Sequence, residues 1–344
     1  MTRRILMALL LVEMLAVSGL VISSYYLDWK QTSQPAPTQP SAKQDKQAVD
    51  APEKLILLFG GDVMLGREVE RKIRQFDLSW PFEKISDITK QADLFVVNLE
   101  SPLRTDADQT LSGSLILRGY PPAVEGLVSA GVDFVSLANN HIPDMRLAGL
   151  QETKKILKQN KIKFTGAGET AADANRPNVL EIEGVKIGFV SCTYGVNFDS
   201  TGVYYNVCSA SRVSSQISAI NKQVDLTVLL AHFGTEYAAA ANSAQKAVAH
   251  AAVEAGADLV IGHHPHVPQP YEKYQGKYIF YSLGNLVFDQ QPGAWRDRSA
   301  LVEIKIEDKK VKSFKLLPYQ IYSYGQPRFL TGLAAEAVVE RFTR

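Results

Sequence analysis

Six short apolar segments that each end in polar residues constrain the fold of this 344-residue chain more than any other feature. They are mostly aliphatic or aromatic and do not alternate with polar residues, a pattern typical of strands buried on both faces. Gly, Asn or His follows each segment within two residues, and Asp62, Glu100 and further histidines lie close behind. The segments are Leu55–Phe59, Asp93–Val97, Val132–Ala138, Leu226–Leu230, Leu259–Ile261 and Tyr278–Leu283.

Helix-like stretches lie between these predicted strands, at Ala123–Ala130, Leu147–Gln159, Val213–Gln223 and Ala239–Ala255. Such alternation predicts an α/β fold with helices on the faces of a sheet. Two other stretches resemble hairpins instead, with turns at Glu183-Gly184 and near Asp308-Lys309. We therefore expect a mixed sheet system, with more than one sheet as an alternative to a single one.

The first 29 residues have a different character. Arg3 and Arg4 precede an apolar run from Ile5 to Ile22, which is long enough to cross most of a bilayer as a helix. The arginines place the N-terminus inside and the rest of the chain outside. We expect a retained single-pass anchor at the cell membrane; a cleaved signal peptide is the alternative. Residues 30–53 are rich in Gln, Pro, Ser and Ala and are predicted to form a flexible spacer.

Bulk composition excludes some partners and leaves other questions open. A net charge of +1 argues against a nucleic-acid partner, because such proteins usually carry a basic face. The two cysteines, Cys192 and Cys208, are too few for a structural zinc site. They either pair outside the cytoplasm or remain neighbouring buried thiols.

Metal-binding side chains gather after the predicted strands. Ligands of open α/β sheets bind beyond the carboxyl ends of the strands, so these side chains are expected to meet there. The densest cluster is Gly262-His263-His264-Pro265-His266, which holds three of the six histidines. We expect His264 and His266 to lie on one side of an extended segment. The full candidate ligand set is Asp62, Glu100, Asn140, His232, His264 and His266.

Each of these motifs also has a structural interpretation. Asp62 after two glycines fits a capped turn, and a lone His232 is often a core histidine with satisfied hydrogen bonds. Together, however, oxygen and imidazole ligands from rigid elements predict a metal site.

Six motifs resemble the CapA family of poly-γ-glutamate capsule synthesis proteins, which is related to the calcineurin-like metallophosphoesterases. In order they are GGDVMLGR, VVNLESPL, SLANNHIPD, LLAHFGTEY, VIGHHPHVPQ and YSLGNLVFD. The resemblance implies a four-layer α/β/β/α sandwich with mixed sheets over residues 54–320. Residues 321–344 are left as a C-terminal tail.

The resemblance also implies roles for particular residues. Asn140 and His141 match an Asn-His motif, and Met64 stands where metallophosphoesterases carry the histidine of Asp-x-His. That replacement weakens the first of two metal positions, because a thioether is a poor ligand for hard divalent ions. We expect one or two Mn, Fe, Zn or Mg ions. With two ions the site keeps a net positive charge for an anionic substrate, and with one it does not.

Several residues are candidates for catalysis or support. His141 is the expected general acid. Glu236 either orients a ligand or sits on the rim of the site. Arg118 and Asn285 either contact an anionic group or have structural roles, and His263 is a further candidate for the outer shell.

Two functions from different classes remain open. One is a metal-dependent hydrolase or transferase acting on an anionic cell-surface polymer, with poly-γ-glutamate implied only by the resemblance. The other is a non-catalytic factor that binds the polymer or other capsule synthesis membrane proteins.

Overall fold

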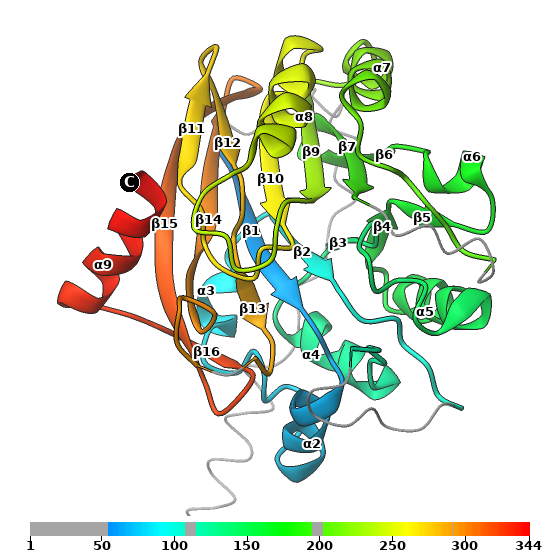
Figure 1. Ribbon diagram of the computed structural model, residues 1–344, viewed down its shortest axis with the longest axis vertical. Coiled ribbons are helices and arrows are strands. Elements are labelled where there is room, and N and C mark those ends of the chain that lie inside the picture. Colours follow the sequence, from blue (N-terminus) through cyan, green and yellow to red (C-terminus); the bar gives the residue numbers. More distant parts are fainter. Residues whose placement is uncertain (1–53, 107–114, 195–201, 291) are drawn as a thin grey trace, which may run out of the picture. The chain divides into compact units, whose positions relative to one another are not determined.

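The structure is a computed structural model that describes residues 54–106, 115–194, 202–290 and 292–344 (Figure 1). The predicted anchor and spacer lie outside these residues. Within the described part of the chain, no helix has the length and apolar character needed to cross a membrane.

An eight-stranded sheet carries the first half of the site. Its order is β16-β15-β14-β1-β2-β3-β4, with β13 also paired to β1. Strands β1 to β4 are mutually parallel, whereas β14, β15 and β16 are antiparallel to their neighbours. The strands are β1 Leu55–Val63, β2 Leu94–Leu99, β3 Phe134–Ser136, β4 Lys163–Thr165, β13 Asn285–Val287, β14 Arg298–Glu307, β15 Lys310–Tyr322 and β16 Gln326–Phe329.

A six-stranded sheet carries the second half. Its order is β11-β12-β10-β9-β7-β6, in which β7, β9, β10 and β12 run parallel. These strands are β6 Asn178–Ile182, β7 Val185–Thr193, β9 Leu226–His232, β10 Leu259–His263, β11 Tyr271–Tyr274 and β12 Lys277–Phe280. A separate small sheet pairs β5 Ala167–Gly168 with β8 Tyr204–Tyr205. The prediction of mixed sheets is confirmed.

Both predicted hairpins are present. β6 and β7 turn at Glu183-Gly184, and β14 and β15 turn at Asp308-Lys309. The two central residues of each turn have positive φ, between 47° and 79°. Two-residue turns of this kind match the twist of antiparallel strands.

The helices cover the sheets close to their predicted positions. They are α2 Arg67–Gln75, α3 Ser86–Thr89, the 3₁₀ turn Pro121–Ala123, α4 Val124–Ser129, α5 Arg146–Gln159, α6 Ala171–Ala174, α7 Ala210–Asn221, α8 Ser243–Glu254 and α9 Gly332–Thr343. α8 begins later than the predicted 239, because Asn242 and Gln245 form a capping box at its N-terminus.

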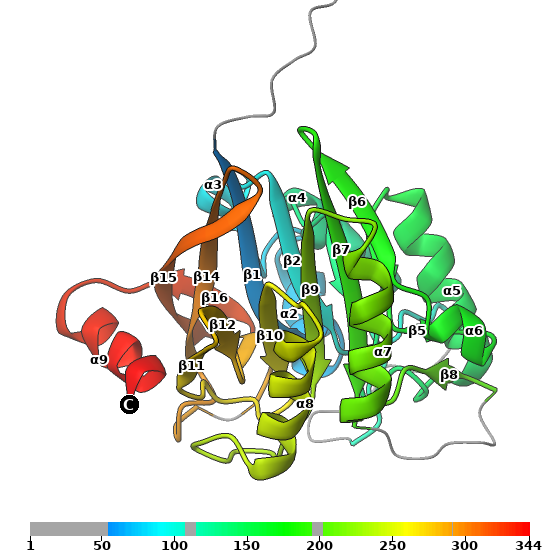
Figure 2. The ribbon, with the colours of Figure 1, turned by 90° about the horizontal axis from the view of Figure 1, so that it is seen from above.

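Alternate residues of the central strands face different layers. In β1, Leu57 and Phe59 pack in the cluster between the two sheets, while Leu58 packs in the cluster beneath α4 and α5. In β9, Leu230 faces the other sheet and Leu229 faces α7 and α8. Figure 2 shows α7 and α8 over the outer face of the six-stranded sheet. The two sheets therefore pack face to face with helices outside them.

The residues set apart as a C-terminal tail, 321–344, belong to the fold. β15 continues to Tyr322, and β16 pairs with it. Val338 and Phe342 of α9 are buried in the cluster between the sheets. A domain boundary at 320 would cut through β15. The sequence signal for α9 is weak, because this helix buries only two side chains.

The open question about the cysteines is also answered. Cys192, in β7, forms a disulfide with Cys208, and both lie in the cluster beneath α7 and α8.

Candidate metal centre

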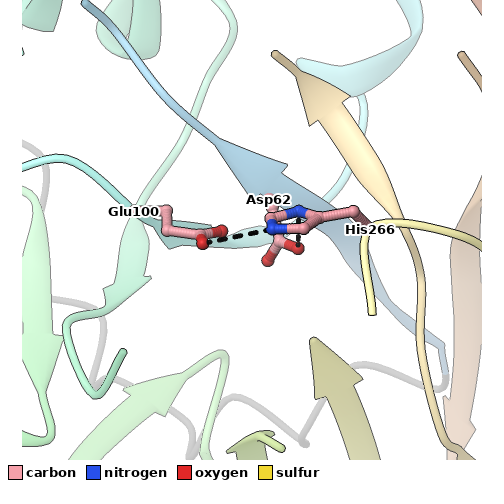
Figure 3. Close-up of side chains that lie close together, drawn as sticks. All are labelled: Asp62, Glu100 and His266. Carbon is pink, nitrogen blue, oxygen red and sulfur yellow. Dashed lines mark ion pairs between the residues drawn. The ribbon is translucent and has the colours of Figure 1, made fainter. Parts of the chain in front are cut away.

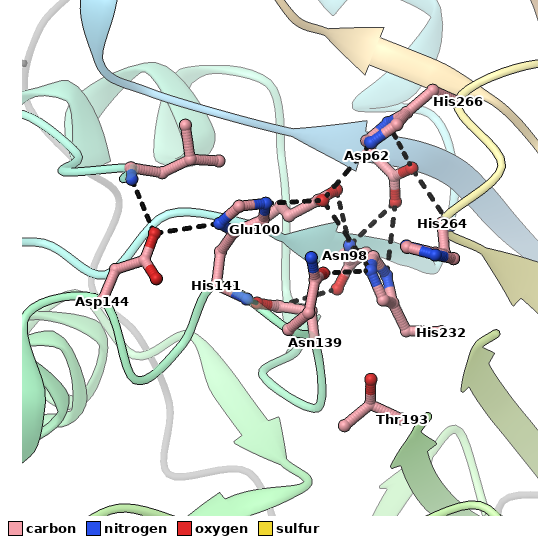
Figure 4. Close-up of polar contacts among 12 residues, drawn as sticks. Asp62, Asn98, Glu100, Asn139, His141, Asp144, Thr193, His232, His264 and His266 are labelled. Carbon is pink, nitrogen blue, oxygen red and sulfur yellow. Dashed lines mark hydrogen bonds and ion pairs between the residues drawn. The ribbon is translucent and has the colours of Figure 1, made fainter. Parts of the chain in front are cut away.

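The candidate site lies where strands of both sheets end (Figure 4). Asp62 is the penultimate residue of β1, and Glu100 follows β2 directly. Asn140 and His141 follow β3, His232 ends β9, and the two remaining histidines follow β10. Since parallel strands of a sheet end at the same edge, segments far apart in sequence bring their polar side chains together.

Asp62, Glu100 and His266 form the centre of the site (Figure 3). One ligand atom of each lies within 4.8 Å of the others, and all three residues are buried. The Nδ1 atom of His266 is 3.4 Å from Asp62 Oδ2, and its Nε2 atom is 3.7 Å from Glu100 Oε1. The three ligand atoms are thus close enough together to bind one cation.

Glu100 carries the clearest sign of a cation site. Its buried Oε1 atom has no hydrogen-bond partner among the described residues. Imidazole Nε2 atoms nevertheless surround it, at 3.7 Å from His232 and 4.0 Å from His141. Burial raises the pKa of Glu100 well above its usual value, and the neighbouring charges of Asp62 and Glu236 raise it further. A buried carboxylate of this kind is stabilised by a cation.

Asp62 stays ionised in the same surroundings. Burial would raise its pKa, but the hydrogen bond with His266 and the nearby His263 and His232 together lower it. Its Oδ1 atom accepts a hydrogen bond from Asn98 at 2.8 Å, and its Oδ2 atom accepts one from the His264 backbone N–H at 3.3 Å.

His232, Asn140 and His264 line the side facing the six-stranded sheet. The Nε2 atom of His232 lies 2.8 Å from Asn140 Oδ1, and its ring centroid lies 4.8 Å from that of His264. Burial lowers the pKa of His232 well below its usual value, with a further contribution from His264. Burial, followed by the charge of His266, lowers the pKa of His264 to about 4. The lowered pKa values favour the neutral ring, which is the form of histidine that binds a metal.

The backbone of the histidine cluster differs from the extended segment we expected. His264 has φ 96° and His266 has φ 58°, and residues 264–267 form bends rather than a strand. Non-glycine residues rarely adopt positive φ, and such strain tends to occur at functional sites. The bond from the His264 N–H to Asp62 and the bond between His266 Nδ1 and Asn285 Oδ1, at 2.9 Å, hold the turn in place.

His141 lies at the rim of the site, with 17% of its side chain exposed. Its Nδ1 atom is 2.9 Å from Asp144 Oδ2, and this contact orients the ring so that Nε2 faces Glu100. Asp144 in turn accepts a hydrogen bond from the Leu117 backbone N–H at 2.6 Å. The ring is therefore fixed, yet open to a substrate.

Sequence reasoning missed three supporting residues: Asn98, Asn139 and Asp144. Asn98 Nδ2 contacts Asp62, Glu100 and His232, at 2.8, 3.4 and 3.2 Å. Asn139 Nδ2 donates to Asn98 Oδ1 and to the Leu99 carbonyl. The quoted motifs VVNLESPL and SLANNHIPD contain all three, so their polar residues beside the proposed ligands were the available signal.

The positively charged side chain of Arg67 also lies near the site. Arg67 forms an ion pair with Asp289, and its charge lowers the pKa of Glu100. Arg67 belongs to the motif GGDVMLGR. Its position depends on Asp289, which is far away in the sequence, so the motif alone did not predict this contact.

The four residues predicted to support the site from outside the ligand set make different contacts. Asn285 touches His266 directly, whereas Glu236 is exposed and influences Glu100 and His264 only through its charge. His263 points away, and its Nε2 atom donates to the Gly60 carbonyl at 3.1 Å. Arg118 is buried in an ion pair with Glu70, at 2.7 Å, and also donates to the Arg104 carbonyl. The structure thus places Arg118 and His263 in structural contacts.

Met64 is buried in the cluster beneath α4 and α5. Its sulfur atom accepts a hydrogen bond from the Gly66 backbone N–H at 3.0 Å. The side chain is therefore part of the core, and the candidate ligands are the carboxylate, amide and imidazole groups described above. These oxygen and nitrogen donors fit a divalent metal ion.

The chain is similar to known proteins over most of its length. Residues 56–290 match the model of a family described as bacterial capsule synthesis protein PGA_cap. The capsule biosynthesis protein CapA of Bacillus anthracis is 30% identical over 290 residues, covering 81% of this chain and 70% of that protein. The PGA biosynthesis protein CapA of Bacillus subtilis strain 168 is 32% identical over 270 residues, covering 77% and 71%.

A solved structure supports the fold alone. A hypothetical protein from Thermus thermophilus superposes with a TM-score of 0.50 at 18% identity, covering 78% of this chain and 100% of that one.

Two packed sheets, with carboxylates and imidazoles gathered at their strand ends, define a class of layered α/β proteins with a candidate metal centre. Within it, the chain belongs to the bacterial capsule synthesis protein family PGA_cap and is a CapA-like protein.

Proposed function

We propose that this protein is a membrane-anchored, extracytoplasmic, metal-dependent hydrolase or transferase that acts on an anionic cell-surface polymer. The observation that carries the proposal is the buried Oε1 atom of Glu100, which has no hydrogen-bond partner among the residues that the structure describes and has three imidazole nitrogens at 3.7–4.0 Å. Such an arrangement is costly unless a cation joins the groups.

Divalent ions would be held by Asp62, Glu100 and His266, with His232, Asn140 and His264 completing the set. When bound, such ions polarise the bond to be cleaved and supply a nucleophile at neutral pH. The rest of the chemistry falls to the protein. His141, positioned by Asp144, holds a proton at the open edge of the site and delivers it to the leaving group.

The relatives support the choice of polymer. One is named a capsule biosynthesis protein and the other a PGA biosynthesis protein. We take an anionic capsule polymer such as poly-γ-glutamate as the substrate class. Other capsule synthesis membrane proteins are its proposed partners.

Two features support the location. The apolar run from Ile5 to Ile22 after Arg3 and Arg4 favours an anchor with the remaining chain outside. The disulfide between Cys192 and Cys208 is of the kind that persists in oxidising compartments.

The decisive experiment measures metal content and activity on the same purified full-length protein. Metal at one or two ions per chain, together with chelator-sensitive cleavage or transfer of poly-γ-glutamate, is the expected result. Metal without turnover on polymer or phosphoester would favour the second candidate, a polymer-binding assembly factor. Met64 is the observation that favours this second candidate, because it stands where the metallophosphoesterases that the motifs resemble carry a histidine, and its sulfur instead accepts a hydrogen bond from the Gly66 N–H.

A further inference from the structure

A basic pocket at the edge of the eight-stranded sheet is separate from the metal centre. It lies between the end of α5, the strand β4 and the segment around α6, which are neighbours in Figure 1. The cavity measures about 370 Å³. Its lining includes five basic side chains and one carboxylate, namely Lys154, Lys158, Lys161, Lys163, Arg176 and Asp173.

The charge of this pocket is largely uncompensated. Lys154 is the exception, since it pairs with Asp173 at 2.8 Å and with Glu169 at 3.3 Å. Within the described part of the chain, Lys158, Lys161 and Lys163 have no carboxylate at ion-pair distance. Because the whole chain has a net charge of only +1, this local concentration of positive charge is a specific feature.

The local backbone places these lysines together. α5 ends at Gln159, and Lys161 reverses the chain with φ 62°, so that β4 begins two residues later. Glycine is the usual residue in this left-handed position. Lysines near a helix C-terminus also complement the helix dipole, but Lys163 and Arg176 lie beyond the helix and gain nothing from it.

We propose that this pocket binds a polycarboxylate chain and serves as a polymer-holding site apart from the metal centre. The choice of polymer rests on the proposed function. Apolar groups from the partly exposed Phe164 and Pro177 lie among the cations and accept the methylene groups of such a chain. The Lys158 ammonium lies over the Phe164 ring, 6.0 Å from the ring centroid. This position leaves less room for a nucleic-acid base to stack on the ring, which argues against single-stranded nucleic acid as the ligand.

The test is binding of a fluorescent poly-γ-glutamate oligomer to the full-length protein in detergent, over a series of salt concentrations. The triple variant Lys158→Gln, Lys161→Gln and Lys163→Gln should weaken binding by about tenfold or more and flatten its salt dependence. The matched control is Lys90→Gln, Lys222→Gln and Lys315→Gln, which removes the same charge from exposed residues that do not line the pocket. It should change the affinity less than about twofold.

A second variant excludes a folding defect. Lys161→Gly removes one cation and relieves the positive φ, so it should weaken binding while the melting temperature is kept. Unchanged affinity in the triple variant, or an equal loss in the control, would overturn the proposal. Tighter binding of polyphosphate than of polyglutamate would overturn the assignment to a polycarboxylate.

The proposed polymer-holding pocket and the proposed metal centre can be tested separately. The variant Glu100→Gln should retain polyglutamate binding even where it abolishes metal binding. If it loses both, the polymer is held at the metal centre and the pocket is not the site.

Discussion

The Oε1 atom of Glu100 lies 3.7 Å from the Nε2 atom of His266, too far for a hydrogen bond and close enough for both to bind the same ion. Neither residue is near the other in sequence. Their meeting depends on β1 and β2 in one sheet and on the turn after β10 in the other.

Glu100→Gln should stabilise the metal-free protein at neutral and alkaline pH and abolish its stabilisation by metal. The pKa of Glu100 is raised in the folded state. The folded wild-type protein is therefore most stable below the ordinary carboxyl pKa, and its free energy of unfolding falls as the pH rises through the raised value. Glutamine removes that ionisation. The measurement is melting temperature against pH, with chelator and with added Mn²⁺ or Zn²⁺.

For comparison, metal at about 100 times its Kd stabilises a binding-competent protein by about 2.7 kcal/mol. If Glu100→Gln responds to metal as the wild type does, Glu100 is not a ligand. If it is no more stable than the wild type in chelator at high pH, the buried charge is not the source of the instability.

The double change His264→Ala and His266→Ala should remove bound metal without unfolding the domain. His266 is part of the enclosed triad, and the ring of His264 lies beside that of His232. Metal content by elemental analysis and the circular dichroism spectrum together check this. The matched control is His250→Ala, a histidine of α8 whose contacts are Glu272 and Tyr274. Equal metal content in all three proteins would exclude the assignment.

His141→Gln should keep the metal and the fold and lower the rate about 100- to 10,000-fold, as expected for removal of a general acid. Asp144→Asn should lower it less, by about 10- to 100-fold, because the ring remains but loses the carboxylate that orients it. Both variants are tested by turnover and by complementation of a deletion strain. Full complementation by His141→Gln with metal still bound would point to the assembly factor.

The proposed topology predicts that protease added to intact protoplasts removes the chain beyond the anchor. The N-terminal residues should stay with the membrane. An N-terminus of the mature protein at Tyr25 or later would mean that the apolar segment is a cleaved signal peptide.

Sequence patterns alone predicted β1, β2, β3, β9, β10 and β12, the two hairpins and the candidate ligands. Short apolar runs bounded by turn residues are typical of strands buried on both faces, and polar residues buried after them need hydrogen-bond partners. For that reason Asp62, Glu100 and His232 were identifiable from their positions alone. A positive-φ hairpin turn such as Glu183-Gly184 is likewise a local property of the chain.

Only the tertiary structure decided which polar residues face the site and which do not. Arg118 and His263 are polar residues close to the predicted strand ends, yet Glu70 and the Gly60 carbonyl hold them elsewhere. Asp144 and Asn98 acquire their roles from contacts across separate elements, and the bends at His264 and His266 depend on Asp62 and Asn285. Contacts between distant segments decide such outcomes, because the orientation of a side chain depends on partners that local sequence does not specify.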